Sequence, residues 1–150
     1  MMRGARLLVL LAVLFLGWGR AMGAESEGVR FGVLDVFVDS SAAPLAAYQL
    51  EIRATNAGVR IVGIEGGEHA AFATPPFYDP KAMQQDHVII AAFSVTSAGK
   101  LPKGRTRVAT IHFQAAKGDA PKFEVIVKAA ASVDGKRIPV TATASERKPL

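Results

Sequence analysis

The chain has 150 residues, half of them hydrophobic, no cysteine and a formal charge of +5. The absence of cysteine excludes disulfide bonds, thiolate metal sites and a cysteine nucleophile. A domain of this size without such cross-links must be stabilised by a full buried apolar core.

The start of the chain reads as a secretory signal peptide. A positively charged beginning precedes an unbroken apolar run over residues 7–16, and small residues follow it. The run is shorter than the roughly 20 apolar residues that a membrane helix needs, whereas a cleaved leader has this length and order. We expect a helical leader over residues 1–23, cleavage after Gly23 or Ala24, and a secreted or periplasmic protein that meets the membrane only during export.

Much of the net charge belongs to this leader. Arg3, Arg6 and Arg20 are three of the 18 basic residues, whereas none of the 13 acidic residues lies there. The rest of the chain is nearly neutral, which weakens the case for a polyanionic ligand. We therefore predict no nucleic-acid partner.

From residue 29 onward, apolar and polar residues alternate with a period of two, as in strands with one buried and one solvated face. In the first run, residues 29–39, both the odd and the even positions are largely apolar, which indicates a strand covered on both sides. The expected strands lie at residues 29–39, 48–54, 59–64, 87–97, 109–114, 123–129 and 137–143. No segment has a helical period of useful length, although one helical turn is expected at residues 81–85.

Turn chemistry separates these strands. Residues 74–80 contain three prolines and cannot form a central strand, because proline lacks the backbone donor. Asp134-Gly135 is typical of a tight hairpin between the last two runs. We predict an all-β, antiparallel β-sandwich of jelly-roll or Greek-key topology over residues 29–144. Residues 24–28 would be a short linker and 145–150 a disordered tail.

Three stretches carry a resemblance to a known family. Residues 48–67 look like paired early strands ending in glycine, residues 104–113 contain an Ala-x-Ile-x-Phe strand, and residues 134–140 form a closing hairpin. Their order and spacing resemble the cohesin domain of bacterial cellulosome scaffolds and its carbohydrate-binding-module-like jelly-roll relatives. The resemblance implies a non-catalytic module that binds a protein, of dockerin type, in polysaccharide degradation or cell-envelope assembly.

The resemblance also implies docking through a sheet face. The strand period places Val108, Thr110, His112 and Gln114 together, opposite the apolar Ile111 and Phe113. We predict that these four residues form the partner-binding surface. The alternative is an ordinary solvated sheet face.

Phe77 and Tyr78 suggest a second candidate function, direct carbohydrate binding. Two aromatic rings between prolines can form an exposed platform for a sugar. The alternative is structural, with Phe77 plugging one end of the sandwich, since large aromatic side chains are mostly buried.

No sequence motif of a catalytic site is present, so we expect no enzymatic activity, no cofactor and no metal. His69, His87 and His112 are far apart in the chain. The stretch from Glu65 to His69 superficially resembles a cation site but reads better as a solvated loop. The basic run from Lys100 to Arg107 is likewise interpreted as solvated, because it is shorter than the usual basic patch.

Overall fold

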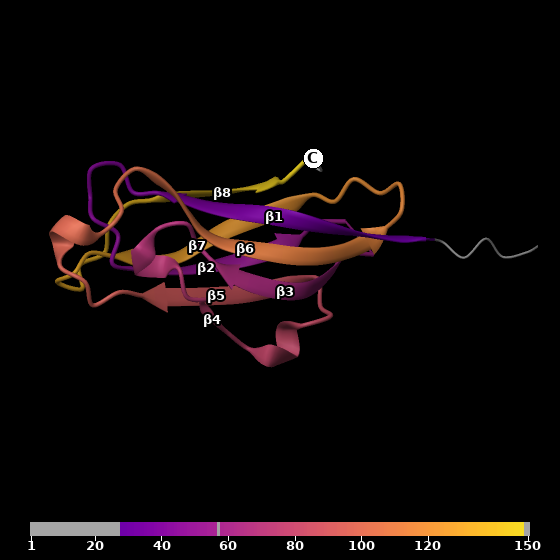
Figure 1. Cartoon of the computed structure of the whole chain (residues 1–150), viewed down its shortest axis with the longest axis horizontal. Helices are drawn as coiled ribbons and strands as arrows, with labels where there is room; N and C mark the ends of the chain where they lie inside the picture. Colours follow the sequence, from indigo (N-terminus) through magenta and orange to yellow (C-terminus); the bar gives the residue numbers. More distant parts are fainter. Residues whose placement is uncertain (1–27, 57, 149–150) are drawn as a thin grey trace, which may run out of the picture.

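The structure, a computed structural model, describes residues 28–56 and 58–148 (Figure 1). The predicted leader over residues 1–23 lies outside the described residues. The described chain forms two four-stranded antiparallel sheets, which confirms the predicted all-β sandwich. Sheet A has the strand order β3-β6-β1-β8, and sheet B has the order β4-β5-β2-β7. The strands are β1 (Val29–Asp39), β2 (Ala47–Ala54), β3 (Arg60–Gly66), β4 (Phe77–Tyr78), β5 (His87–Phe93), β6 (Arg105–Ala116), β7 (Phe123–Ala131) and β8 (Thr141–Glu146).

The chain crosses repeatedly between the two sheets. Apart from β4 and β5, which are neighbours in sheet B, every two consecutive strands belong to different sheets. The first and last strands, β1 and β8, are antiparallel neighbours in sheet A. Each sheet is therefore completed only by residues from distant parts of the sequence.

The core lies between the sheets and follows the alternation of the strands. Leu34, Val36 and Val38 of β1 point inward from sheet A, and Leu50 and Ile52 of β2 point inward from sheet B. All five side chains are fully buried, and burial of one such side chain contributes about 1.5–3 kcal/mol. The Tyr48 hydroxyl, also buried, donates a hydrogen bond to the Val108 carbonyl across the sandwich at 3.0 Å. Burial raises the pKa of Tyr48 well above its ordinary value.

Phe113 of β6 fills the space that a glycine leaves. Its ring lies over Gly32, where an added Cβ would come within 2.2 Å of the ring. The same ring packs against Phe123 of the opposite sheet with centroids 5.0 Å apart. Phe113 thus joins the two sheets near one end of the core.

Three short 3₁₀ turns interrupt the loops: η1 (Ala70–Phe72), η2 (Pro80–Ala82) and η3 (Ala98–Lys100). The predicted helical turn at residues 81–85 therefore lies slightly earlier, at η2, where the Asp79 carboxylate caps the turn by accepting from the Lys81 N–H. In η1, Phe72 is buried against Tyr48, with ring centroids 5.2 Å apart. Phe72, and not Phe77, plugs the core at this place.

The C-terminal part differs from the prediction. After the Asp134-Gly135 turn the chain pairs with β7 at a single bridge, Ala131 to Arg137. It then crosses to sheet A, where β8 begins only at Thr141 and pairs with β1. The predicted strand at 137–143 is therefore displaced toward the C-terminus. The predicted disordered tail is wrong for Ser145 and Glu146, which belong to β8.

Removing the Phe113 ring should destabilise the fold strongly. We expect Phe113→Ala to lower the free energy of unfolding by about 3–5 kcal/mol, because a buried ring that contacts both sheets is lost. Phe31 of β1 is 69 % exposed, so Phe31→Ala should stay within about 0.5 kcal/mol of the wild type. Urea unfolding measures both; equal effects of the two substitutions would contradict the proposed packing role.

Candidate functional site

The four β6 residues predicted to bind a partner do not form one exposed face. A β-bulge shifts the register between β1 and β6: Val36 pairs with Ala109, but Phe37 pairs with Arg107. Val108 is the extra residue, and it points into the core, where it is fully buried. Thr110 does lie on the outer side of the sheet, as predicted, but the residue is only 1 % exposed. The prediction is wrong for these two residues.

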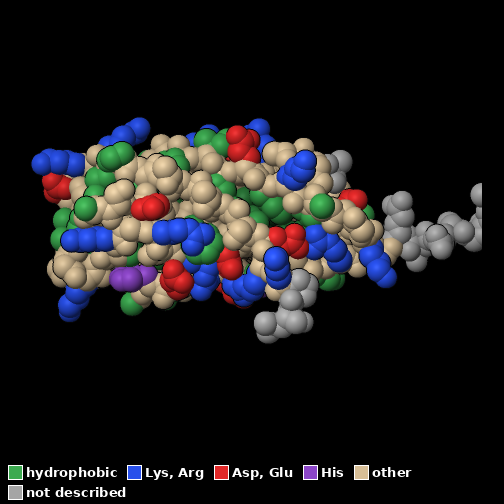
Figure 2. Space-filling model, turned by 90° about the horizontal axis from the view of Figure 1, so that it is seen from above, with side chains coloured by type: hydrophobic (Ala, Val, Ile, Leu, Met, Phe, Trp, Pro, Cys, Tyr) green, Lys and Arg blue, Asp and Glu red, His purple; other side chains and the backbone are tan. Residues whose placement is uncertain are grey.

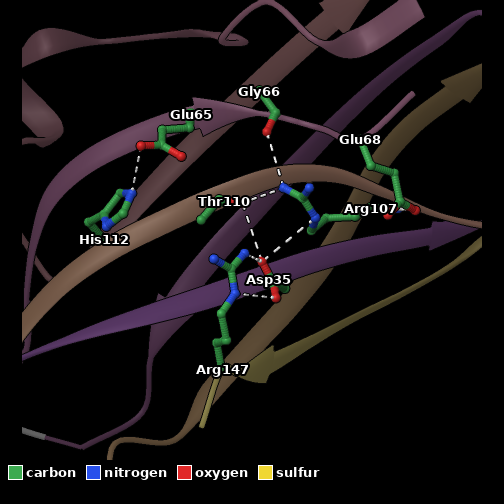
Figure 3. Close-up of polar contacts among 8 residues, drawn as sticks. All are labelled: Asp35, Glu65, Gly66, Glu68, Arg107, Thr110, His112 and Arg147. Atoms are coloured by element: carbon green, nitrogen blue, oxygen red, sulfur yellow. Dashed lines mark hydrogen bonds and ion pairs between the residues drawn. The ribbon is translucent and has the colours of Figure 1, made fainter. Parts of the chain in front are cut away.

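Thr110 is covered by a cluster of charged side chains on the outer face of sheet A (Figure 3). The Asp35 carboxylate of β1 accepts from Arg147 Nη2 at 2.6 Å and Nε at 3.1 Å, and from the Thr110 hydroxyl at 3.3 Å. Arg107 Nη1 donates to Thr110 Oγ1 at 2.6 Å, and its Nε lies 3.8 Å from Asp35. The Asp35 carboxylate lies between the two guanidinium groups and connects β1 to β6 and to the residue that follows β8, so the cluster acts as a structural tie. Arg107 is consequently not the solvated residue that was expected.

His112 and Gln114 are half-buried on the same face. His112 Nε2 lies 3.1 Å from the Glu65 carboxylate of β3, but without the alignment of a hydrogen bond. Figure 3 shows this pair apart from the Asp35 cluster. The outer face of sheet A therefore carries two local charge pairings and no continuous apolar patch along β6.

The side chains of the Glu65–His69 stretch diverge. Glu65 approaches His112, the Glu68 carboxylate accepts from the Arg107 N–H at 2.9 Å, and His69 Nδ1 caps η1 by accepting from the Ala71 N–H. Over residues 28–56 and 58–148, no three His, Asp or Glu side chains are grouped as a metal site would require.

The two predicted platform residues, Phe77 and Tyr78, point to opposite sides of β4. Phe77 pairs with Ala91 on the outer face of sheet B and is 70 % exposed, whereas Tyr78 pairs with buried Ile90 and packs against the core. Adjacent residues of a strand face opposite sides of the sheet. Phe77 and Tyr78 therefore cannot form one platform together.

Phe93, at the end of β5, is the aromatic partner of Phe77. The two rings are nearly parallel, with an angle of 11° between their planes and 6.2 Å between centroids. Phe93 is 65 % exposed. Phe93 lies in a strand that the sequence predicts. Apolar residues occupy both the odd and the even positions of that strand, so alternation alone does not show which residues face outward.

A groove of about 260 Å³ lies beside this aromatic pair. Its floor consists mostly of alanines from three adjacent strands, with the exposed Gln49 of β2 among them. Ala47 of β2 pairs with Phe93 on one side and with Ala131 on the other. The outward alanines that line it are Ala47, Ala91, Ala129 and Ala131. We call these four residues, with Phe77 and Phe93, the aromatic face.

Exposed apolar side chains continue beyond the aromatic face. Val95 follows Phe93 and is 94 % exposed, and Val133 is also exposed. Both line a second hollow that adjoins Phe93 and Ala131. Large contiguous apolar surface of this kind is uncommon on a monomeric protein and marks interaction sites.

A charge group on sheet B involves Glu51, Arg53 and Lys128. A bulge in β7 inserts Lys128 between the residues that pair with Gln49 and Leu50. Its Nζ lies 2.6 Å from the Glu51 carboxylate, which Arg53 also contacts. Hydrogen bonds from Lys128 and Arg53 lower the pKa of Glu51. The strands β2 and β7 thus carry, next to the aromatic face, a carboxylate that two cationic side chains of the same chain bind.

Comparisons with protein-family models, curated proteins and solved structures gave no match. Among the residues that the structure describes, no helix has the length and apolar character needed to cross a bilayer.

The Glu51 group predicts a measurable pH dependence. Because the folded-state pKa is lowered, the stabilising contribution of the carboxylate is complete above its ordinary pKa of about 4.3 and is lost as the pH falls through the lowered value. We expect Lys128→Met to raise the pKa of Glu51 toward the ordinary value, measured by NMR titration of the side-chain carboxyl carbon. An unchanged titration in Lys128→Met would contradict the contact.

Proposed function

We propose that the chain is an exported, non-catalytic, cohesin-like binding module that recognises another protein through the aromatic face of sheet B. The observation that carries the proposal is the exposed, nearly parallel Phe77–Phe93 pair beside the alanine-floored groove. This site replaces the β6 face as the candidate docking surface.

The aromatic face has the composition of an interface centre. Aromatic side chains dominate binding energy where they enter a desolvated pocket on a partner. The groove beside them accepts a partner side chain, because alanines leave room above the sheet. A rigid sheet presents both features at little conformational cost on binding.

Charge plays a small part in the proposed recognition. Glu51 is already bound by Arg53 and Lys128, so this carboxylate is not free to pair with a partner. We expect the contacted patch of the partner to be apolar, with long-range electrostatic attraction contributing little.

The cohesin-like, jelly-roll classification rests on the sequence resemblance and is supported by the repeated crossing of the chain between two sheets. On this proposal the partner is a protein with a dockerin-like module, in polysaccharide degradation or envelope assembly. Export follows from the leader, residues 1–23, and the proposed location is secreted or periplasmic.

Direct binding of a polysaccharide is the second candidate function. The near-parallel orientation of the exposed Phe77 and Phe93 rings favours it, because sugar rings stack on aromatic faces. Its site differs from the predicted one, since Phe93 takes the place of Tyr78.

The proposal is tested by using the full chain to capture partners from the secreted and envelope fractions of its own cells. A captured protein is then purified, and its affinity is measured for the wild type, the double variant Phe77→Ser/Phe93→Ser and the control Phe31→Ser. Loss of interface anchors costs about 2 kcal/mol or more, so we expect the double variant to weaken binding by at least about thirtyfold.

The control variant Phe31→Ser shows whether a loss of binding is specific to sheet B. Phe31 is as exposed as Phe93 but belongs to sheet A, so Phe31→Ser should bind normally. Unchanged affinity of the double variant would contradict the proposal. Retention on insoluble polysaccharide, with no captured protein and with loss in the double variant, would favour the second function.

A further inference from the structure

The outer edge of β8 presents unpaired backbone groups. Among the residues that the structure describes, β8 pairs only with β1, and the Arg147 N–H just beyond it donates to the Val33 carbonyl at 2.7 Å. Backbone groups alternate sides along an antiparallel strand, so those of Ala142, Ala144 and Glu146 point away from β1. Within the described ranges, no loop backbone donates to or accepts from β8 at this edge.

The other three sheet edges are protected. β3 is covered by the chain, because Ile61 exchanges backbone hydrogen bonds with Gln84 and Gln85. β4 has two residues and is flanked by prolines. β7 carries charged residues and the Lys128 bulge, and its end is covered by the bridge to Arg137. Short strands, charges, prolines and bulges are the devices that prevent edge-to-edge pairing.

Most of β8 lacks these devices. From Thr141 to Ser145 it contains only threonine, alanine and serine, and its pairing with β1 has no register shift. The first charge is Glu146, whose carboxylate is bound by Arg30 at 2.6 Å. Figure 2 looks onto the side of the molecule where β8 lies, and there charged side chains of both signs are mixed and separated by uncharged surface. No field of one sign therefore opposes the approach of a similar surface.

We propose that β8 pairs with β8 of a second copy of the chain, antiparallel across a two-fold axis at Thr143, and joins the two A sheets into one eight-stranded sheet. In this register the outward threonines at 143 face each other, and Thr141 faces Ser145 of the second copy. On the inner side, Ala142 faces Ala144 of the second copy.

The register agrees with the free backbone groups. The Ala142–Ala144 pairs are those whose N–H and C=O groups point outward, so each pair can exchange two hydrogen bonds. Thr143 then occupies a non-hydrogen-bonded pair, in which opposite Cα atoms lie about 4.5 Å apart. From Thr141 to Ser145, every contact in the register is between small, uncharged residues, so this part of the strand is complementary to itself, as a two-fold interface requires.

The absence of cysteine from the chain makes this geometry directly testable. Thr143 and Thr141 are both exposed on the outer face of β8. In the full chain, Thr143→Cys should form a disulfide-linked dimer under mild oxidation, since the two sulfur atoms would meet at the axis. Thr141→Cys is the matched control, because its two copies would lie four residues apart, about 14 Å.

The result is read on non-reducing gels, with ultracentrifugation of the uncrosslinked wild type at increasing concentration. We expect at least tenfold faster cross-linking of Thr143→Cys than of Thr141→Cys, and a concentration-dependent dimer. Equal rates, faster linking through position 141, or a wild type that stays monomeric at millimolar concentration would overturn the proposal.

Charge variants give an independent check. Thr143→Lys and Thr143→Glu should each reduce the dimer fraction, and an equimolar mixture of the two should restore it, because opposite charges then meet at the axis. Circular dichroism shows whether each variant is folded. Failure of the mixture to restore the dimer while both variants remain folded would also overturn the proposal. The Phe77→Ser/Phe93→Ser variant should dimerise normally, because the aromatic face belongs to the other sheet.

Discussion

The structure depends on the burial of two facing rows of side chains, one from each sheet. With no cysteine in the chain, no covalent cross-link assists this packing. The inward residues of β1, β2 and β6 are almost fully buried, and the remaining elements are attached to this centre. The outward residues are released from packing, which allows sheet A to carry charge pairs and sheet B to carry exposed phenylalanines.

Most strands could be predicted from alternation, since a period of two over several residues has one physical explanation. The predicted start and end of β1 agree with the structure, and those of β2 and β3 agree to within two residues. β4 was missed because two residues among prolines show no period. The course of the chain after Gly135 was missed because the choice of sheet for the last strand depends on an open place beside β1, which no local pattern records.

The candidate site could be predicted only in part. Phe77 was identified from its exposed, proline-rich setting, but its partner Phe93 is brought to it by the pairing of β4 with β5. The prediction of a binding face on β6 was wrong because of a bulge. One extra residue in the strand reverses which positions point inward and which point outward beyond it. Val108 shows this, because counting by two places it outside, whereas the bulge places it in the core.

The antiparallel pairing of β1 with β8 determines how the domain responds to force. Because the two strands are antiparallel, the start of β1 and the end of β8 point toward the same end of the sandwich. The end of β8 lies beside the middle of β1, with Glu146 opposite Leu34. A pull on both termini would therefore load the hydrogen bonds between these strands one pair at a time, as a zipper opens, and not all together in shear. The salt bridges of Asp35 with Arg147 and of Arg30 with Glu146 lie where this pairing begins, so they would be the first contacts of the C-terminal segment with β1 to carry the tension.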